Sequence, residues 1–362
     1  MPSSPDEGPS AVIASVGTAP APHRYEQDEL IAAFKAYWSA KHHNTARVDQ
    51  LHKAVRVGGR NLALPMEAYP ALRGFGEAND AFVRVATDIG AEAVRRALDL
   101  AGLQPTDVDA ITFTTVTGVA APSIDARVHN RLRMRTDVKR MPLFGLGCVA
   151  GAAGVARLYD YLRAWPDQVA VLLSVELCSL TIQRGDLSIP NLIASGLFGD
   201  GAAAVVAVGA RRAEKMGLTG PRILGSQSRF YPDTERVMGW DVGDGGFKIV
   251  LSAAVPEVVR QYARADVDGF LASRGLTRAQ IGCWVCHPGG PKVLEAFEEE
   301  LELPPGALQL TWDSLEHIGN LSSASVLHVL ADTLARRPPP GTPGLMMALG
   351  PGFCSELVLM DW

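Results

Sequence analysis

The sequence lacks an excess of positive charge and any long apolar run. Its 362 residues carry 34 Lys and Arg against 39 Asp and Glu, a net charge of −5. Such a chain has no global basic field to hold a nucleic-acid backbone or an anionic membrane. No apolar run approaches the ~18 residues of a membrane span. The first lysine or arginine is Arg24, so the apolar stretch before it lacks the positive start of a signal peptide. We therefore expect neither a nucleic-acid partner nor integral membrane association.

Cysteine is also sparse. Five cysteines in a chain of this length do not form a disulfide scaffold, and their odd number fits a reduced cytoplasm. We therefore expect a cytoplasmic protein. Hydrophobic residues make up 47% and charged residues 20% of the chain, as in an ordinary globular protein. The length predicts about two domains or one large two-lobed domain.

Strand-like and helix-like patterns alternate along the chain, which predicts an α/β protein with covered sheets. The residues from Val169 to Leu177 form a continuous apolar run, as expected of a strand buried on both faces. The predicted strands are 11–17, 109–116, 169–177, 202–208, 247–251, 281–286, 345–349 and 356–360. The predicted helices are 77–103, 123–134, 148–162, 256–274, 291–301 and 322–336. The predicted organisation is a flexible N-terminus at 1–10, a first half at 11–210 and a second half at 211–362, with RRAEKMGLTGP as a connector.

A lone cysteine, Cys148, lies in the stretch GLGCVAGAAG at a predicted strand-to-helix junction. A helix N-terminus carries partial positive charge and unsatisfied N–H groups, which stabilise a thiolate and lower the thiol pKa. This predicts a reactive nucleophile. A buried core cysteine in a glycine-rich packing helix is an equally good interpretation of this motif alone.

Two further motifs could serve such a nucleophile. His287 ends a predicted strand in CHPGGP, where the turn exposes an imidazole that could pair with a thiolate or donate to an oxyanion. Asn320, in GNLSSA, precedes a predicted helix whose cap would normally be Ser322 or Ser323, which leaves its amide free to face a substrate. Each motif alone is explained as well by a structural role.

Other candidate motifs are weaker. Cys283 and Cys286 have CxxC spacing without a second pair, and residues three apart on a strand face opposite sides, so we expect no metal site. The stretch LFGDGAAA has neither a GxGxxG pattern nor a P-loop lysine and is better explained as a turn. The acidic run at 298–300 fits a solvated helix face.

Taken together, these motifs resemble the thiolase superfamily and specifically the type III polyketide synthases, across 11–362. GLGCVAGAAG resembles the nucleophile motif, HPGGP and GNLSSA the motifs of the other two catalytic residues, and GPGFCSE the C-terminal glycine-rich loop. The resemblance implies a five-layered αβαβα sandwich and a homodimer. It also implies coenzyme A thioesters as substrates, with no cofactor or metal.

The resemblance assigns Cys148 as the nucleophile, His287 as its base and oxyanion donor, and Asn320 as a second donor. It places a gatekeeper phenylalanine at Phe198 and an aliphatic residue, Ile249, at the second gatekeeper position. It further implies substrate contacts at Thr117 and Thr181. Ala121 stands at the position from which plant members send a methionine into the partner's cavity. Coenzyme A contacts are implied at Lys53, Arg56 and Arg60.

The closest resemblance within the family is to bacterial long-chain alkylpyrone and alkylresorcinol synthases, through MPLFGLGCVAGAAGVAR, SVELCSLT, MGWDVG and NLSSAS. It implies a medium- or long-chain fatty acyl-CoA starter extended with malonyl-CoA, with an acyl tunnel passing Cys178. A single-condensation ketoacyl synthase acting with a carrier protein is the main alternative. A papain-like hydrolase is disfavoured because the family's cysteine context is missing, and a non-catalytic subunit because Cys148 is present.

Overall fold

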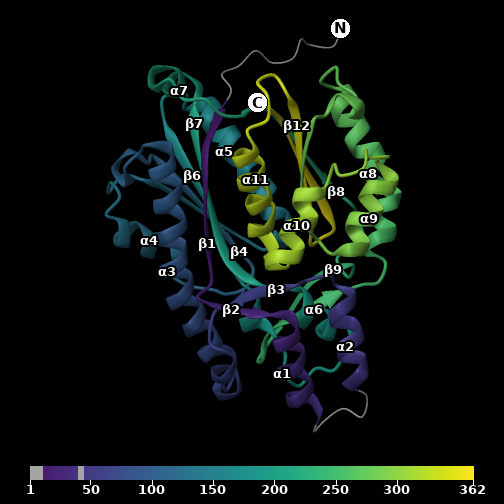
Figure 1. Ribbon diagram of the computed structural model, residues 1–362. Coiled ribbons are helices and arrows are strands. Elements are labelled where there is room, and N and C mark those ends of the chain that lie inside the picture. Colours follow the sequence, from purple (N-terminus) through teal and green to yellow (C-terminus); the bar gives the residue numbers. More distant parts are fainter. Residues whose placement is uncertain (1–10, 40–44) are drawn as a thin grey trace.

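The computed structural model describes residues 11–39 and 45–362, so the predicted flexible segment at 1–10 lies outside the described residues. Nine strands form one hydrogen-bonded sheet (Figure 1). In spatial order they are β11 (Cys283–Cys286), β12 (Pro343–Gly350), β13 (Cys354–Asp361), β8 (Arg222–Phe230), β1 (Ala11–Pro20), β7 (Asp200–Gly209), β6 (Val169–Leu177), β4 (Ala110–Thr115) and β5 (Lys139–Phe144).

The sheet is divided into two halves at a weak seam. Strand β1 pairs with β7 along nearly its whole length, but it pairs with β8 only through Ala11↔Ile223 and Val12↔Arg222. The strands on the β7 side come from the first half of the chain, and those on the β8 side come from the second half. The two halves of the sheet can therefore separate into two layers, although all nine strands remain in one hydrogen-bonded sheet.

Helices cover both layers. They are α1 (Gln27–Ser39), α2 (Thr45–Ala54), α3 (Phe75–Ala101), α4 (Ile124–Leu132), α5 (Ala150–Ala164), α6 (Ile189–Leu197), α7 (Ala210–Met216), α8 (Val255–Ala272), α9 (Pro291–Glu300), α10 (Gln309–Ile318) and α11 (Ser325–Arg336). In Figure 1, α5 and α11 lie between the two halves of the sheet, α3 and α4 lie outside one half, and α8 and α9 lie outside the other.

Alternating side chains of the strands fill three separate cores. In β6, Val171 and Leu173 pack towards α3, while Leu172 packs towards α5 and α11. In β12, Met346 packs into the same central core, while Leu345 packs towards α8 and α9. This period-2 alternation places apolar residues on both faces of each half-sheet. The predicted five-layered αβαβα sandwich is confirmed.

Several elements were not predicted. They are α1, α2, α6, α10, strand β8, strand β9 (Met238–Gly243), a hairpin of β2 (His23–Glu26) with β3 (Gly59–Leu62), and short 3-10 turns such as η1 (Met66–Ala71), η3 (Gly147–Val149), η4 (Cys178–Thr181) and η6 (Ser322–Ala324). The strand predicted at 247–251 is β10 (Gly246–Leu251), and it forms a hairpin with β9. The predicted connector RRAEKMGLTGP was wrong in part, because its first residues form α7. Among residues 11–39 and 45–362, no helix combines the length and the apolar character needed to cross a membrane.

Helices α5 and α11 cross closely near their N-terminal ends. A Cβ at Gly151 in α5 would overlap the backbone oxygen of Ser323 and the side chain of Val326. Only glycine allows this approach without displacing the backbone of η6. The start of α5 and the segment before α11 are thereby fixed against each other.

We expect Gly151→Ala to lower the free energy of unfolding by about 1–3 kcal/mol, because the added methyl overpacks the central layer. The matched control is Gly269→Ala in α8, an exposed position where a Cβ meets no atom within 4 Å. That change should leave stability unchanged or raise it by up to about 1 kcal/mol. Denaturant unfolding of both variants is the measurement. Equal stabilities would contradict the close crossing.

Candidate active site

Three distant segments meet around one cavity of about 460 Å³. Cys148, His287 and Asn320 all line it. They come from η3, from the residue after β11 and from the residues just before η6. The side chains are nearly inaccessible, with exposed fractions of 8%, 4% and 1%. The structure thus brings together the three residues that the sequence motifs singled out.

Cys148 lies in η3, directly before α5. The preceding Gly147 has φ 58°, and a Cβ there would overlap the ring of Pro351. The GPGFCSE loop therefore packs directly on the turn that carries Cys148. Both the positive φ and this close contact require glycine at position 147. The Cys148 thiol donates to Ser322 Oγ at 3.6 Å.

The charge state of Cys148 differs from the sequence prediction. Burial raises the pKa of the Cys148 thiol to about 12, and the nearby Glu176 carboxyl acts in the same direction. The start of α5 was expected to lower this pKa, but the loss of hydration outweighs the helix end. At physiological pH the buried thiol is therefore neutral and needs a proton acceptor to become a nucleophile.

His287 is suited to be that acceptor. Its backbone N–H donates to the carbonyl of Met347 at 2.9 Å, which fixes the residue to β12. Both ring nitrogens are buried and have no hydrogen-bond partner among the described residues. Burial lowers the pKa of His287 to about 3, so the ring is neutral at physiological pH. A neutral imidazole holds one N–H donor and one free acceptor nitrogen.

Asn320 is held by its backbone and by its side-chain oxygen. Its N–H donates to Leu197 O at 2.9 Å, and its carbonyl accepts from Gly199 N at 3.0 Å. Phe198 is thereby bridged directly to Asn320. The side-chain Oδ1 accepts from the Ser322 backbone N–H at 2.7 Å, so this oxygen is held locally and does not face the cavity freely.

This bond also orients the Asn320 amide. Since the Ser322 backbone N–H can only donate, the side-chain oxygen of Asn320 must face it, and Nδ2 takes the opposite position. Nδ2 makes only a long 3.4 Å contact with Gly289 O, in the turn after His287. The N–H donors of Asn320 are therefore available to an oxygen in the cavity.

The other predicted substrate contacts divide into two groups. Phe198, Ile249 and Cys178 line the cavity together with the three residues above. Thr117 and Thr181 are not part of this lining: Thr117 donates to the buried Glu176 carboxyl at 2.8 Å, and Thr181 donates to Cys178 O at 2.7 Å. Both hydroxyls have structural partners instead.

The predicted basic contacts are also divided. Lys53 is exposed and pairs with Asp49 at 3.2 Å, while Arg56 pairs with Glu295 at 3.1 Å. Both lie beside the cavity, because their neighbours Ala54 and Val55 line it. Arg60, the third expected coenzyme A contact, points into the protein. It is 1% exposed and donates to Gln27 and to backbone carbonyls of α6.

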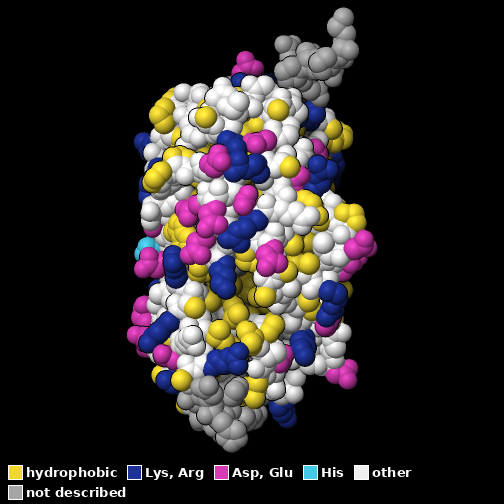
Figure 2. Space-filling model, turned by 90° about the vertical axis from the view of Figure 1, so that its right-hand side faces the viewer, with side chains coloured by type: hydrophobic (Ala, Val, Ile, Leu, Met, Phe, Trp, Pro, Cys, Tyr) yellow, Lys and Arg dark blue, Asp and Glu magenta, His cyan; other side chains and the backbone are white. Residues whose placement is uncertain are grey.

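The face that carries α8 and α9 is hollowed. Figure 2 shows a recess floored by hydrophobic side chains, with Lys and Arg side chains around it. Helices α8 and α9 both contribute lining residues, among them Val255 and Lys292. An apolar cavity with basic groups near its opening suits an apolar acyl chain attached to an anionic carrier.

Three relevant residues were not predicted. Ser322 accepts from the Cys148 thiol, and Val116, one position before Thr117, lines the cavity. Glu176 lies fully buried in β6, where Ser323, Thr117 and the Val116 N–H donate to it, and burial raises its pKa. A carboxylate within a run of apolar residues was the one signal in the sequence that could have revealed Glu176.

The five-layered fold is that of the thiolase class of condensing enzymes. Within that class, residues 74–218 match the family model of FAE1/type III polyketide synthase-like proteins, and residues 222–361 match that of the C-terminal domain of chalcone and stilbene synthases. Together these matches cover most of the chain. The protein belongs to the type III polyketide synthases, which are decarboxylative condensing transferases.

Individual relatives agree with this assignment. The chain is 52% identical to the 1,3,6,8-tetrahydroxynaphthalene synthase of Streptomyces peucetius subsp. caesius, over 99% of this chain and 94% of the relative. It is 36% identical to a putative chalcone synthase of Bacillus subtilis (strain 168), over 97% and 99% of the two chains. The crystal structure of the tetrahydroxynaphthalene synthase of Streptomyces coelicolor A3(2) superposes with a TM-score of 0.91 at 29% identity, over 97% and 99% of the two chains.

We expect alkylation of Cys148 by iodoacetamide to depend on His287. In His287→Gln the buried thiol must ionise alone, so the rate should rise roughly tenfold per pH unit from pH 6 to 10, as expected for a thiol whose pKa is far above that range. The wild-type rate should exceed the variant rate at pH 7 and depend less steeply on pH, because the imidazole accepts the proton. Identical pH profiles for the two proteins would exclude proton transfer from Cys148 to His287.

Proposed function

We propose that Cys148 carries the growing chain as a thioester, with His287 as its base and both His287 and Asn320 as oxyanion donors. The observation that supports this assignment is the convergence of the three side chains on one buried cavity. A thiolate suits this reaction because it both attacks thioesters and leaves from them readily.

Loading begins with transfer of the Cys148 proton to the neutral ring of His287. The resulting thiolate attacks the acyl-CoA carbonyl, the carbon–sulfur bond to coenzyme A breaks, and the leaving thiolate takes the proton back from His287. The protein regains a neutral imidazole and holds the acyl group on Cys148. This order uses the neutral state that burial imposes on both groups.

Extension begins with loss of CO₂ from malonyl-CoA. The electrons of the broken carbon–carbon bond form an enolate whose oxygen accepts from a His287 N–H and from Asn320 Nδ2. The enolate carbon then attacks the Cys148 thioester, and the sulfur leaves as thiolate. Donors aimed at a developing oxyanion are strongest where water is excluded, as in this cavity.

The product that we propose is a tetrahydroxynaphthalene made from malonyl-CoA alone. The support is the 52% identity to the Streptomyces peucetius enzyme of that name. Such a naphthalene has ten ring carbons, which is five two-carbon units, and no alkyl chain that would report a fatty starter. This proposal replaces the long-chain starter that the sequence motifs favoured.

A medium- or long-chain fatty acyl-CoA starter that yields an alkylpyrone or alkylresorcinol is the second candidate. It is favoured by the apolar lining of the cavity and by Cys178, a small buried side chain in its wall. In either case we propose that the enzyme acts as a homodimer in the cytoplasm. The dimer is supported by exposed Val119 and Phe144, 42% and 57% accessible in the single chain, and by the exposed loop at Ala121.

Product analysis separates the two starters. Purified protein with malonyl-CoA as sole substrate should form a tetrahydroxynaphthalene or its air-oxidation product, identified by mass. A ladder of fatty acyl-CoAs should compete poorly with this reaction. If malonyl-CoA alone yields nothing and long acyl-CoAs yield alkylpyrones, the second candidate is correct and the first is wrong. No condensation in either assay would refute both.

Cys178 variants test whether an acyl chain passes this residue. Cys178→Phe adds volume to the cavity wall, and overpacking typically costs about 1–3 kcal/mol. A long starter should therefore lose most of its kcat/KM while a short one loses little. Cys178→Ala, which removes the thiol without filling the space, is the matched control. An unchanged chain-length profile in Cys178→Phe would show that the chain runs elsewhere.

Asn320→Asp separates the two functions of this side chain. It keeps an acceptor for the Ser322 N–H but loses the amide donor, so it should still be acylated on Cys148. Malonyl-CoA decarboxylation should fall by about two orders of magnitude. Intact-protein mass spectrometry and CO₂ release are the measurements. Loss of acylation with normal decarboxylation would assign Asn320 a different function.

A further inference from the structure

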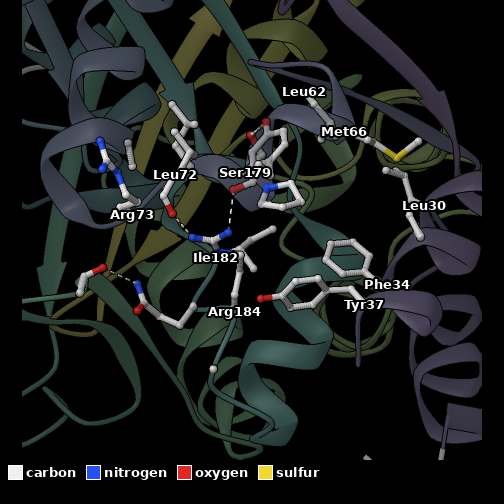
Figure 3. A pocket seen from close by; sticks show the side chains of 18 of the residues that line it. Leu30, Phe34, Tyr37, Leu62, Met66, Leu72, Arg73, Ser179, Ile182 and Arg184 are labelled. Carbon is white, nitrogen blue, oxygen red and sulfur yellow. Dashed lines mark hydrogen bonds between the residues drawn. The ribbon is translucent and has the colours of Figure 1, made fainter. Parts of the chain in front are cut away.

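A second cavity of about 400 Å³ lies apart from the active-site cavity (Figure 3). Its wall is formed by α1, η1, the first turn of α3 and the segment 179–185. Of the described residues, none lines both cavities. The turn η4 separates them, since Cys178 borders the active-site cavity and Ser179 and Leu180 border the second. The proposed condensation uses no group in this second cavity.

One side of the second cavity is aromatic. Phe34 and Tyr37 are three positions apart on α1 and present their rings to the cavity in Figure 3. Residues three apart lie on one face of a helix. Leu30, Leu62 and Met66 extend the apolar surface around them. Aromatic walls favour a flat ring, which they can contact face-on or edge-on.

The charged groups of the cavity all have one sign. Arg60, Arg73 and Arg184 line it, and no Asp or Glu is among its described lining residues. Arg73 is exposed and pairs with Glu77 at 2.8 Å, so the cavity's positive charge rests on Arg60 and Arg184. Arg184 donates to the backbone carbonyls of Tyr69 and Leu72, so its guanidinium is fixed in the wall. The Asp200 carboxyl, which acts on Arg60, lies outside the lining and accepts from the Ala63 and Ser179 N–H groups. The cavity therefore favours an anionic ligand.

Arg60 also has an unused donor. It is 1% exposed, and its terminal nitrogens donate to Gln27, Ser195 and Gly196. Its Nε has no partner among the described residues. A buried N–H without an acceptor is unfavourable, and an oxygen of a bound molecule would satisfy it. Arg60 and the aromatic wall line the same cavity.

We propose that the second cavity is a separate binding site for a planar aromatic molecule with an acidic oxygen, an aromatic carboxylate or a phenol. The ring lies against Phe34 and Tyr37, and the oxygen accepts from Arg60 Nε. The site is distinct from the condensation site and does not depend on which starter or product the active-site cavity accepts.

The probe is 2-naphthoate, titrated into the full-length protein by calorimetry. We expect one site per chain and weaker binding of the neutral 2-naphthamide. Ala33→Trp places a large side chain at a cavity-lining, exposed position of α1 and should weaken binding at least about tenfold. Ala32→Trp, exposed on the same helix and outside the lining, should bind as wild type. If Ala33→Trp does not fold, Ala78→Phe on α3 fills the cavity from the other side.

Alkylation of Cys148 distinguishes this site from the active-site cavity. Carboxamidomethyl Cys148 should leave 2-naphthoate binding unchanged, because Cys148 lines the other cavity. Binding that survives Ala33→Trp, or that is lost on alkylation, would overturn the proposal. So would the absence of saturable binding at millimolar probe. Altered condensation rates in Ala33→Trp without any probe would show that the two cavities act as one and would also overturn it.

Discussion

The close crossing of α5 and α11 determines the position of nearly everything else in the active site. Both helices belong to the central layer, whose side chains complete the cores of both half-sheets. Their N-terminal ends are fixed together where Gly151 meets the backbone of Ser323. Cys148 directly precedes one helix, and Asn320 precedes the turn that leads into the other. Cys148 and Asn320 are therefore brought together by helix packing rather than by a flexible loop.

Burial decides the resting chemistry of this site. Thiol and imidazole are both deprived of water, and each is neutral for that reason. A neutral pair carries no permanent charge that would have to be stabilised in an apolar cavity. In the proposed reaction, charge arises first on the sulfur and the ring, and then on an enolate oxygen. The amide of Asn320 is already oriented for that oxygen by the Ser322 N–H.

The sequence predicted the parts of the fold that have strong periodicity. The buried strand β6 at Val169–Leu177 and the long helix α3 were located to within about two residues, because their apolar patterns are unambiguous. Helices α1, α2 and α6 were missed because they pack mainly on one another around a small cluster with Val48 and Leu192, which leaves only a weak pattern in the sequence.

The site was predicted at the level of motifs but not of environment. The motifs identified Cys148, His287 and Asn320, because the three motifs are specific in combination although each alone is weak. They could not reveal that desolvation exceeds the effect of a helix end at Cys148, or that Arg60 points inwards. Thr117 and the cavity-lining Val116 are adjacent in a bend after β4, and the sequence alone does not show which of the two side chains faces the cavity.

The weak seam between β1 and β8 and the shared central layer have an evolutionary consequence. Neither half of the chain contains a complete set of reactive groups, so the two halves had to remain joined once the chemistry depended on both. The wall of the cavity is different, because much of it comes from α2, α6 and the β9–β10 hairpin, which lie outside the central layer. Mutations there can reshape the space for the product while the reacting groups stay in place. A fold built in this way can acquire new products without inventing a new reaction.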